Sequence, residues 1–240
     1  MSFMDRERQI ADVKGRAAAL VPLHVQWRRV DVAGEPFDMA ACGSMEVLLN
    51  ALIEADPATA AVRDERLPYW TEIWPSSLVV AARALEEKSL AGRRVMDLGC
   101  GLGLAGVAAG RRGASVCFCD YDEQALRFAA LNWAANVGGP FQGAVMDWRE
   151  PAFGKEFDLI LAADVVYEKR FFEPILGAFD TLLKPGGAIW LGEPHRPFST
   201  GFFECLAAHG YVFRREDRVT PFPNQEKPTT VGLYSISKPP

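Results

Sequence analysis

Residues 95–103 read Val-Met-Asp-Leu-Gly-Cys-Gly-Leu-Gly, and an acidic residue, Asp120, ends the next apolar run. This pattern predicts a short buried strand that runs into a glycine turn, followed by a helix and a second strand with a carboxylate at its tip. Glycines allow the backbone to approach a bound molecule closely, because they carry no Cβ atom. The stretch therefore indicates a site for a nucleoside-bearing cofactor.

One candidate cofactor is a dinucleotide. Gly101, Gly103 and Gly106 satisfy the pattern G-x-G-x-x-G. Asp120 follows Gly101 at close to the spacing of about 20 residues at which NAD sites place their ribose-binding acid.

The other candidate is S-adenosylmethionine (SAM), which fits the longer series Asp97-x-Gly99-x-Gly101-x-Gly103. A carboxylate at Asp97 would repel a pyrophosphate, because both are negatively charged. Beside SAM the same carboxylate can orient the methionine ammonium group. Asp97 therefore favours SAM over NAD.

The composition limits the class of protein. A chain of 240 residues suits either one large α/β domain or one domain with an N-terminal addition. No apolar run approaches the ~20 residues of a membrane span, and the first residues lack the layout of a signal peptide. The net charge of −5 gives no general attraction to nucleic acid. We therefore expect neither a membrane nor a nucleic acid as a partner.

The cysteines and histidines indicate a cytoplasmic protein without a metal. Five cysteines are scattered along the chain, a distribution typical of reduced, buried thiols. The three histidines lie far apart, and no second close-set cysteine pair is present to complete a zinc site. We therefore expect no metal site.

Strand and helix patterns alternate from residue 76 onward. Helices are expected at 76–87, 104–110, 123–136, 171–183 and 201–209. Strands are expected at 94–98, 114–119, 143–146, 157–163, 188–191, 211–219 and 229–237. The segment Lys184-Pro-Gly-Gly187 is expected to end the helix before it. This alternation predicts a doubly wound, mostly parallel seven-stranded sheet.

The two ends of the chain complete the expected fold. No helix pattern separates the last two strands, so they should form an antiparallel hairpin. A doubly wound sheet with such a hairpin is the arrangement of class I methyltransferases, which again favours SAM. Residues 1–65, with helices at 5–20 and 45–55 and a strand at 25–32, are expected to form an extension that covers the site. Residues 66–240 are expected to form the SAM-binding domain.

Acidic and aromatic residues follow several of the strands. Ligands of such sheets bind at the carboxyl ends of the strands, so these residues should line one pocket. Asp120 can accept hydrogen bonds from both ribose hydroxyls. Asp147 can accept from the adenine amino group, and Trp148 can stack on the ring. Tyr121 either flanks the adenine or caps the next helix, and the sequence leaves both open.

An aromatic wall is expected just ahead of the helix at 76–87, with which the alternating pattern begins. Residues 67–77 there read Leu-Pro-Tyr-Trp-Thr-Glu-Ile-Trp-Pro-Ser-Ser. Trp74 is the first choice for contact with the methionine end of SAM, and Glu72 is the second. The alternative is that Trp70 and Trp74 pack in the core at helical spacing, and it applies more strongly to Trp70.

Asp164 and Tyr167 follow the strand at 157–163, near the expected methyl group. A carboxylate and an aromatic ring can bind an amine and orient it for in-line methyl transfer. The alternative is that Asp164 caps the next helix and Tyr167 packs locally.

At these residues the chain resembles the class I, seven-β-strand SAM-dependent methyltransferases. Within them it is similar to the protein-lysine methyltransferases that carry an Asp-x-x-Tyr motif. The matching pieces are Tyr69-Trp70, Glu72-x-Trp74-Pro75, Asp97–Gly103, Asp120–Asp122, Asn132-Trp133, Asp147-Trp148, Phe157–Ile160 and Asp164–Tyr167. No Asn-Pro-Pro-Tyr motif is present, which disfavours methylation of nucleobase or glutamine amides.

The resemblance implies a fold, a cofactor and an acceptor. It implies SAM contacts at Trp74, Gly99, Gly101, Asp120, Trp148 and the Ala163 backbone, with Asp164 and Tyr167 beside the acceptor. We expect a SAM-dependent N-methyltransferase that acts on a protein lysine and releases S-adenosylhomocysteine. The alternatives are methylation of a small amine or a nicotinamide-like heterocycle, and a SAM-binding protein without catalysis.

Overall fold

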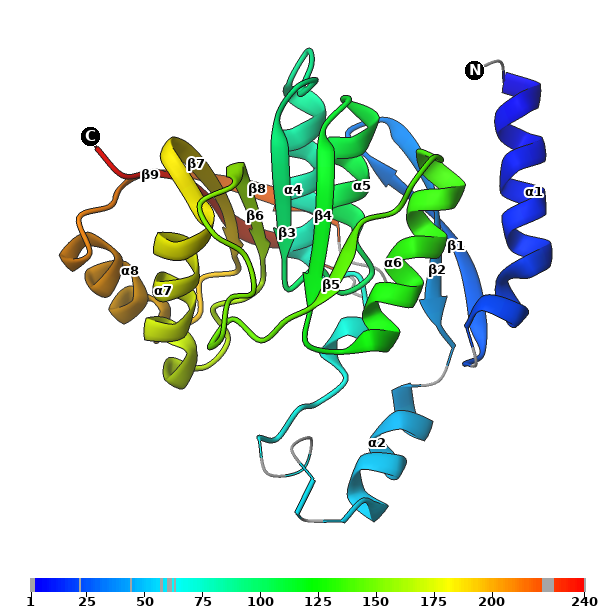
Figure 1. The fold of residues 1–240 in the computed structure, drawn as a ribbon, viewed down its shortest axis with the longest axis horizontal. Coiled ribbons are helices and arrows are strands. Elements are labelled where there is room, and N and C mark those ends of the chain that lie inside the picture. Colours follow the sequence, from blue (N-terminus) through cyan, green and yellow to red (C-terminus); the bar gives the residue numbers. More distant parts are fainter. Residues whose placement is uncertain are drawn as a thin grey trace.

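The computed structural model describes residues 3–21, 23–43, 45–56, 58–59, 62, 64–221 and 227–239. Its centre is a seven-stranded sheet with the strand order β5-β4-β3-β6-β7-β9-β8 (Figure 1). The strands are β3 (Arg94–Leu98), β4 (Ser115–Asp120), β5 (Gly143–Val145), β6 (Phe157–Ala163), β7 (Leu183–Glu193), β8 (Val212–Thr220) and β9 (Thr229–Ser237). β3 to β7 pair in parallel, and β9 lies antiparallel between β7 and β8. The predicted sheet and its terminal hairpin are confirmed.

Helices cover both faces of the sheet (Figure 1). On one face lie α4 (Pro75–Glu86), α5 (Leu104–Arg111) and α6 (Glu123–Asn136), and on the other lie α7 (Phe172–Leu182) and α8 (Ser199–Ala208). Successive side chains of a strand point to opposite faces, so Leu159 and Leu161 enter one core while Ile160 and Ala162 enter the other. Burial on both faces explains why β6 is apolar almost throughout.

The boundary between α7 and β7 differs from the prediction. Lys184–Gly187 does not separate a helix from a strand, because β7 already begins at Leu183. Leu183 pairs with Phe157, and regular pairing resumes between Ala188 and Leu159, so the segment forms an irregularity within the strand. Gly186, with φ of 75°, supplies the backbone conformation that this irregularity needs.

The N-terminal part adds α1 (Phe3–Leu20), a hairpin of β1 (Val25–Val32) and β2 (Glu35–Cys42), and α2 (Met45–Glu54). The sequence analysis did not predict β2. Its signal was the dipeptide Ala33-Gly34, in which both residues have positive φ, as tight hairpin turns require.

Two asparagines of α6 fasten this hairpin to the domain. The Asn132 side chain accepts from the amide of Ala40 at 2.6 Å and donates to its carbonyl at 3.0 Å. Asn136 makes the corresponding pair of hydrogen bonds with the backbone of Asp38. α1 packs against α6 as well, so α1 and the hairpin lie beside α6 (Figure 1).

The cysteines are free thiols. Cys42, Cys117 and Cys119 are buried as expected, whereas Cys100 and Cys205 are only partly buried, because one lies in the glycine turn and the other on α8. Within the described ranges, no helix combines the length and the apolar character needed to cross a membrane.

Candidate functional site

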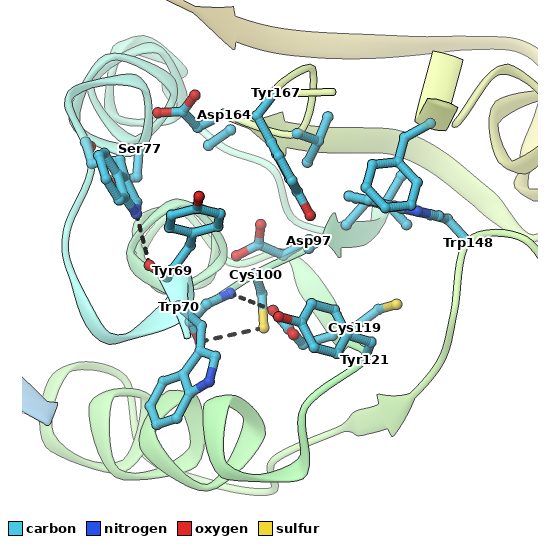
Figure 2. Close-up of a pocket in the computed structure, with 18 of the residues that line it drawn as sticks. Tyr69, Trp70, Ser77, Asp97, Cys100, Cys119, Tyr121, Trp148, Asp164 and Tyr167 are labelled. Carbon is cyan, nitrogen blue, oxygen red and sulfur yellow. Dashed lines mark hydrogen bonds between the residues drawn. The ribbon is translucent and has the colours of Figure 1, made fainter. Parts of the chain in front are cut away.

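A cavity of about 510 Å³ opens at the carboxyl ends of β3, β4 and β6 (Figure 2). Every residue that the sequence singled out lines it. These residues are Glu72, Trp74, Asp97, Gly99, Gly101, Gly103, Asp120, Tyr121, Asp147, Trp148, Ala163, Asp164 and Tyr167. The parallel strands bring together the residues from Asp97 to Tyr167, which lie up to 70 positions apart, as the strand-end rule anticipates. Glu72 and Trp74 come instead from the segment ahead of α4 (Pro75–Glu86).

Asp97 is buried at the end of β3, with 2% of its surface exposed. Its Oδ2 accepts a hydrogen bond from the amide of Gly106 at 2.8 Å. A Cβ atom on Gly106 would lie 2.4 Å from the Phe118 ring and 2.8 Å from this oxygen, so only glycine fits there. Burial raises the pKa of Asp97 from 3.8 to about 7.

The glycine turn needs its glycines for two reasons. Gly99, Gly101 and Gly103 all have positive φ, which other residues rarely adopt. Gly103 also begins α5, and a Cβ there would approach Ala129 and Phe118 to 3.0 Å. Gly103 therefore acts in the packing of α5 as well as lining the cavity.

Asp120 anchors the turn from β4. Its Oδ2 accepts from the Gly101 amide at 2.9 Å and its Oδ1 from the Asp122 amide at 3.1 Å. Burial raises its pKa from 3.8 to about 6. Each carboxylate oxygen keeps further acceptor capacity, because it has two lone pairs.

The residues after Asp120 have separate tasks. The side chain of Asp122 caps α6 by accepting from the Gln124 amide, and it also accepts from Trp70 Nε1 at 2.7 Å. Tyr121 therefore does not cap the helix. It lines the cavity instead, and its hydroxyl donates to the Leu67 carbonyl at 3.0 Å.

Residues 64–68, here called the strap, lie along one wall of the cavity. Ion pairs join the strap to Asp147, which follows β5. Asp64 and Asp147 are both bound by Arg66 and Arg149, with N–O distances of 2.6 to 3.4 Å. The arginines lower the pKa of Asp64 to about 2. Burial alone would raise the pKa of Asp147, but Arg149 and Arg66 lower it overall. Both oxygens of Asp147 are thus occupied by arginine donors.

Aromatic rings form a second wall. Tyr69, in the short helix η1 (Tyr69–Thr71), lies 6.1 Å from Trp74 and 5.7 Å from Tyr167 between ring centroids. The ring centroids of Tyr167 and Trp148 are 6.3 Å apart, so Tyr69, Tyr167 and Trp148 form a row of rings between the strap and the end of β5 (Figure 2). Trp70 is buried against Phe128 outside this row, which confirms the core alternative for that residue.

Asp164 follows β6 in a left-handed backbone conformation, with φ of 63°. Its amide donates to the Gly192 carbonyl, and its carboxylate meets Arg196 with 2.5 Å between Oδ1 and Nη1. The residue before the next short helix, η2 (Lys169–Phe171), is Glu168, so Asp164 does not cap it. The backbone conformation at Asp164 therefore directs its side chain toward the cavity and toward Arg196.

Sequence reasoning did not single out several residues that line the cavity. They are Asp64, Arg66, Arg149, Phe171 and Arg196. The strand-end rule could have found Arg196, which lies three residues after β7. The strap carried no such signal, because its ion pairs join segments that are distant in sequence.

Glu72 and Trp74 occupy the outer part of the wall. Glu72 forms an ion pair with Arg28 of β1 at 3.2 Å, and Trp74 Nε1 donates to the Tyr69 carbonyl at 2.7 Å. The hairpin therefore contacts the cavity wall through Arg28, which does not itself line the cavity.

The comparisons with known proteins agree with this geometry. A family model described as "Lysine methyltransferase" matches residues 65–208. The chain is 32% identical over 132 residues to the electron transfer flavoprotein beta subunit lysine methyltransferase of Danio rerio, covering 54% of this chain and 51% of that protein. It is 27% identical over 152 residues to a ubiquinone biosynthesis O-methyltransferase of Pseudomonas aeruginosa, covering 62% and 65%. The matches thus span about half to two thirds of the length of these relatives.

A solved structure shows the same fold. Magnesium protoporphyrin IX methyltransferase from Synechocystis PCC 6803, crystallised with bound SAM, superimposes with a TM-score of 0.56 at 15% identity. The superposition covers 82% of this chain and 92% of that one.

Proposed function

Because the chain belongs to the lysine methyltransferase family, we propose that it is a SAM-dependent methyltransferase that methylates an amine, first of all a lysine side chain of a protein. The observation that carries this proposal is the shared cavity. The glycine turn with Asp97 and Asp120 lines one part of it, and Asp164 and Tyr167 line another. A cofactor held by the first group would meet an acceptor held by the second.

The cavity suits SAM in its size and in its hydrogen-bond acceptors. Its volume of about 510 Å³ lies within the usual range of cofactor sites. An added Cβ at Gly99 would lie 3.1 Å from Val165 and 3.3 Å from Trp148, so the turn approaches the far wall closely. Asp97 and Asp120 together supply two carboxylates, which match an ammonium group and a ribose diol.

We assign the parts of SAM to residues as follows. Asp97 would orient the ammonium group, Asp120 would accept from the ribose hydroxyls, and Trp148 would stack on the adenine. Asp147 would have to share an adenine amino group with Arg149, so its main task is to hold the strap. When bound, SAM supplies an electrophilic methyl group.

At the acceptor end, the chain's own residues would place the amine. Asp164 offers a buried carboxylate oxygen, Oδ1, which receives no hydrogen bond of acceptable geometry from the described part of the chain. Tyr167 and Tyr69 present ring surfaces that favour a cationic or polarised N–H group. Methyl transfer is an in-line displacement, so positioning accounts for most of the work of the enzyme.

A small-molecule acceptor is the second candidate. The similarity to an O-methyltransferase of ubiquinone biosynthesis favours it, because that relative is matched over a longer stretch than the lysine methyltransferase of Danio rerio.

Incubation of the protein with methyl-labelled SAM and a cell lysate tests the proposal. Label in protein, released as methyl-lysine on hydrolysis, is the expected result. Label in small molecules would favour the second candidate. The variant Asp120→Ala should abolish labelling, whereas Asp158→Ala, at the opposite end of β6, should not. Failure of the wild-type protein to bind SAM in calorimetry would refute the proposal.

A further inference from the structure

Arg196 is placed in the cavity by a turn that a buried glutamate builds. Glu193 ends β7 with no exposed surface, and its carboxylate accepts from the amides of His195 at 2.9 Å and Arg196 at 2.7 Å. His195 has a positive φ of 57°, which reverses the chain there. The turn directs the Arg196 side chain back toward Asp164.

The contact between Asp164 and Arg196 is an ion pair without an aligned hydrogen bond. Their Oδ1 and Nη1 atoms are 2.5 Å apart, and the side chains are 8% and 25% exposed. Among the residues that the structure describes, neither atom has a hydrogen-bond partner of acceptable geometry, although both atoms are buried. Arg196 Nη1 also lies 4.0 Å from Glu193 Oε1, but two backbone amides already bind the Glu193 carboxylate. The guanidinium therefore acts mainly on the nearer Asp164, whose carboxylate is still open to a donor from a bound molecule.

This charge matters for an amine acceptor. The nitrogen must be neutral to attack a methyl group, because only then is its lone pair free. A lone buried carboxylate would favour the ammonium form and hold the acceptor protonated. A guanidinium beside that carboxylate cancels the attraction and repels a second cation. Burial raises the pKa of Asp164, and Arg196 opposes this rise.

We propose that Arg196 is a positioning residue that neutralises Asp164, so that the site prefers the neutral amine of the acceptor to its ammonium form. This inference rests on the proposed function. The neutral nitrogen donates an N–H to Asp164 and forms the new N–C bond as the C–S bond of the sulfonium breaks. The bonding electrons stay on sulfur as a thioether, and the product ammonium loses its extra proton to solvent.

The probe is n-butylammonium, which has the length and charge of a lysine side chain. Its affinity is measured at pH 7 by tryptophan fluorescence, with S-adenosylhomocysteine bound to the protein. Arg196→Gln should bind n-butylammonium at least tenfold more tightly than the wild type, because the carboxylate is no longer neutralised. Arg196→Lys, which keeps the charge, should stay within about threefold of the wild type. Arg214→Gln, on β8 and outside the cavity, is the matched control and should bind as the wild type does.

Two results would overturn the inference. One is unchanged or weaker n-butylammonium binding in Arg196→Gln. The other is binding of pentanoate by the wild type that Arg196→Gln loses, which would assign Arg196 to an anionic group of the acceptor. Arg196→Met replaces Arg196→Gln if the latter no longer binds S-adenosylhomocysteine. Absence of S-adenosylhomocysteine binding in the wild type would instead count against the proposed function.

The pH profile gives a second readout, which a merely structural role would not move. In the lysate assay, label incorporation by Arg196→Gln should need a pH about one unit higher than the wild type to reach half of its maximum. Equal profiles would contradict the inference.

Discussion

In the proposed cofactor site, the negative charge of Asp97 would bind the ammonium group of SAM, whereas burial of that charge destabilises the fold. The substitution Asp97→Asn separates the two effects. The Asp97 side chain is almost fully buried, and burial together with repulsion from Asp120 raises its pKa from 3.8 to about 7. Asparagine has nearly the same shape and can still accept from the Gly106 amide. The substitution therefore removes the charge and keeps the hydrogen bond.

The sign and size of the effect follow from the difference between the folded and unfolded pKa. The folded protein binds more protons than the unfolded chain between pH 3.8 and about 7, so its stability falls as the pH rises through this window. One pKa unit corresponds to about 1.4 kcal/mol, so ionised Asp97 costs the folded state about 4 kcal/mol at pH 8. At pH 5 most of this cost is absent, because the folded protein keeps the proton.

We therefore expect Asp97→Asn to stabilise the cofactor-free protein by about 2–4 kcal/mol at pH 8. For a chain of this size that corresponds to a rise in Tm of roughly 5–15 °C. The gain should be about 3 kcal/mol smaller at pH 5. At the same time the affinity for SAM should fall, because the ammonium group loses its carboxylate.

Thermal unfolding of the wild type and the variant at pH 5 and pH 8 measures this, with SAM affinity taken from calorimetry. Asp158→Asn is the control, because Lys184 holds the pKa of Asp158 below its usual range and its loss should give no gain at pH 8. A Tm of Asp97→Asn that is unchanged or lower at pH 8, or a gain that is equal at both pH values, would refute the reasoning.

Four further outcomes are expected. Asp120→Asn should weaken SAM binding roughly 10- to 100-fold through lost charge-assisted bonds, and wild-type affinity should decline below about pH 6 as Asp120 takes up a proton; pH-independent affinity would argue against the ribose role. Tyr167→Ala should leave SAM affinity within about threefold while turnover falls at least tenfold, and a collapse of SAM binding would place Tyr167 against the cofactor instead. Asp64→Asn should speed SAM dissociation at low salt and reduce the salt dependence of that rate, because the strap loses part of its ion-pair network; stopped-flow rates equal to the wild type would show that these ion pairs do not help to retain the cofactor. Asn132→Ala should lower the free energy of unfolding by about 2–4 kcal/mol in urea, because the Ala40 amide and carbonyl and the Leu102 carbonyl lose their partner; a loss below about 1 kcal/mol would contradict that account.

Local patterns in the sequence predicted the sheet because each of them is set by near neighbours in the chain. The apolar run at 157–163 specifies a strand buried on both faces, and the glycines at 99, 101 and 103 specify a turn with positive φ. The strand-end rule then placed the predicted site residues in one cavity. The hairpin strand β2 was missed, because the short turn at Ala33-Gly34 is a weaker signal than the regular alternation of strands and helices after residue 76.

The sequence alone determined the fold class, the glycine turn and the carboxylates that line the cavity, since these follow from periodicity, backbone freedom and strand order. Only the tertiary structure decided how those carboxylates are charged and partnered. Asp147 is bound by two arginines of the wall, and Asp164 is paired with Arg196. Asp97 and Asp120 are buried and form no ion pair with the residues that the structure describes. The charge state of a carboxylate depends on its burial and on its contacts with distant segments of the chain. The residues next to Asp97 or Asp164 in the sequence determine neither.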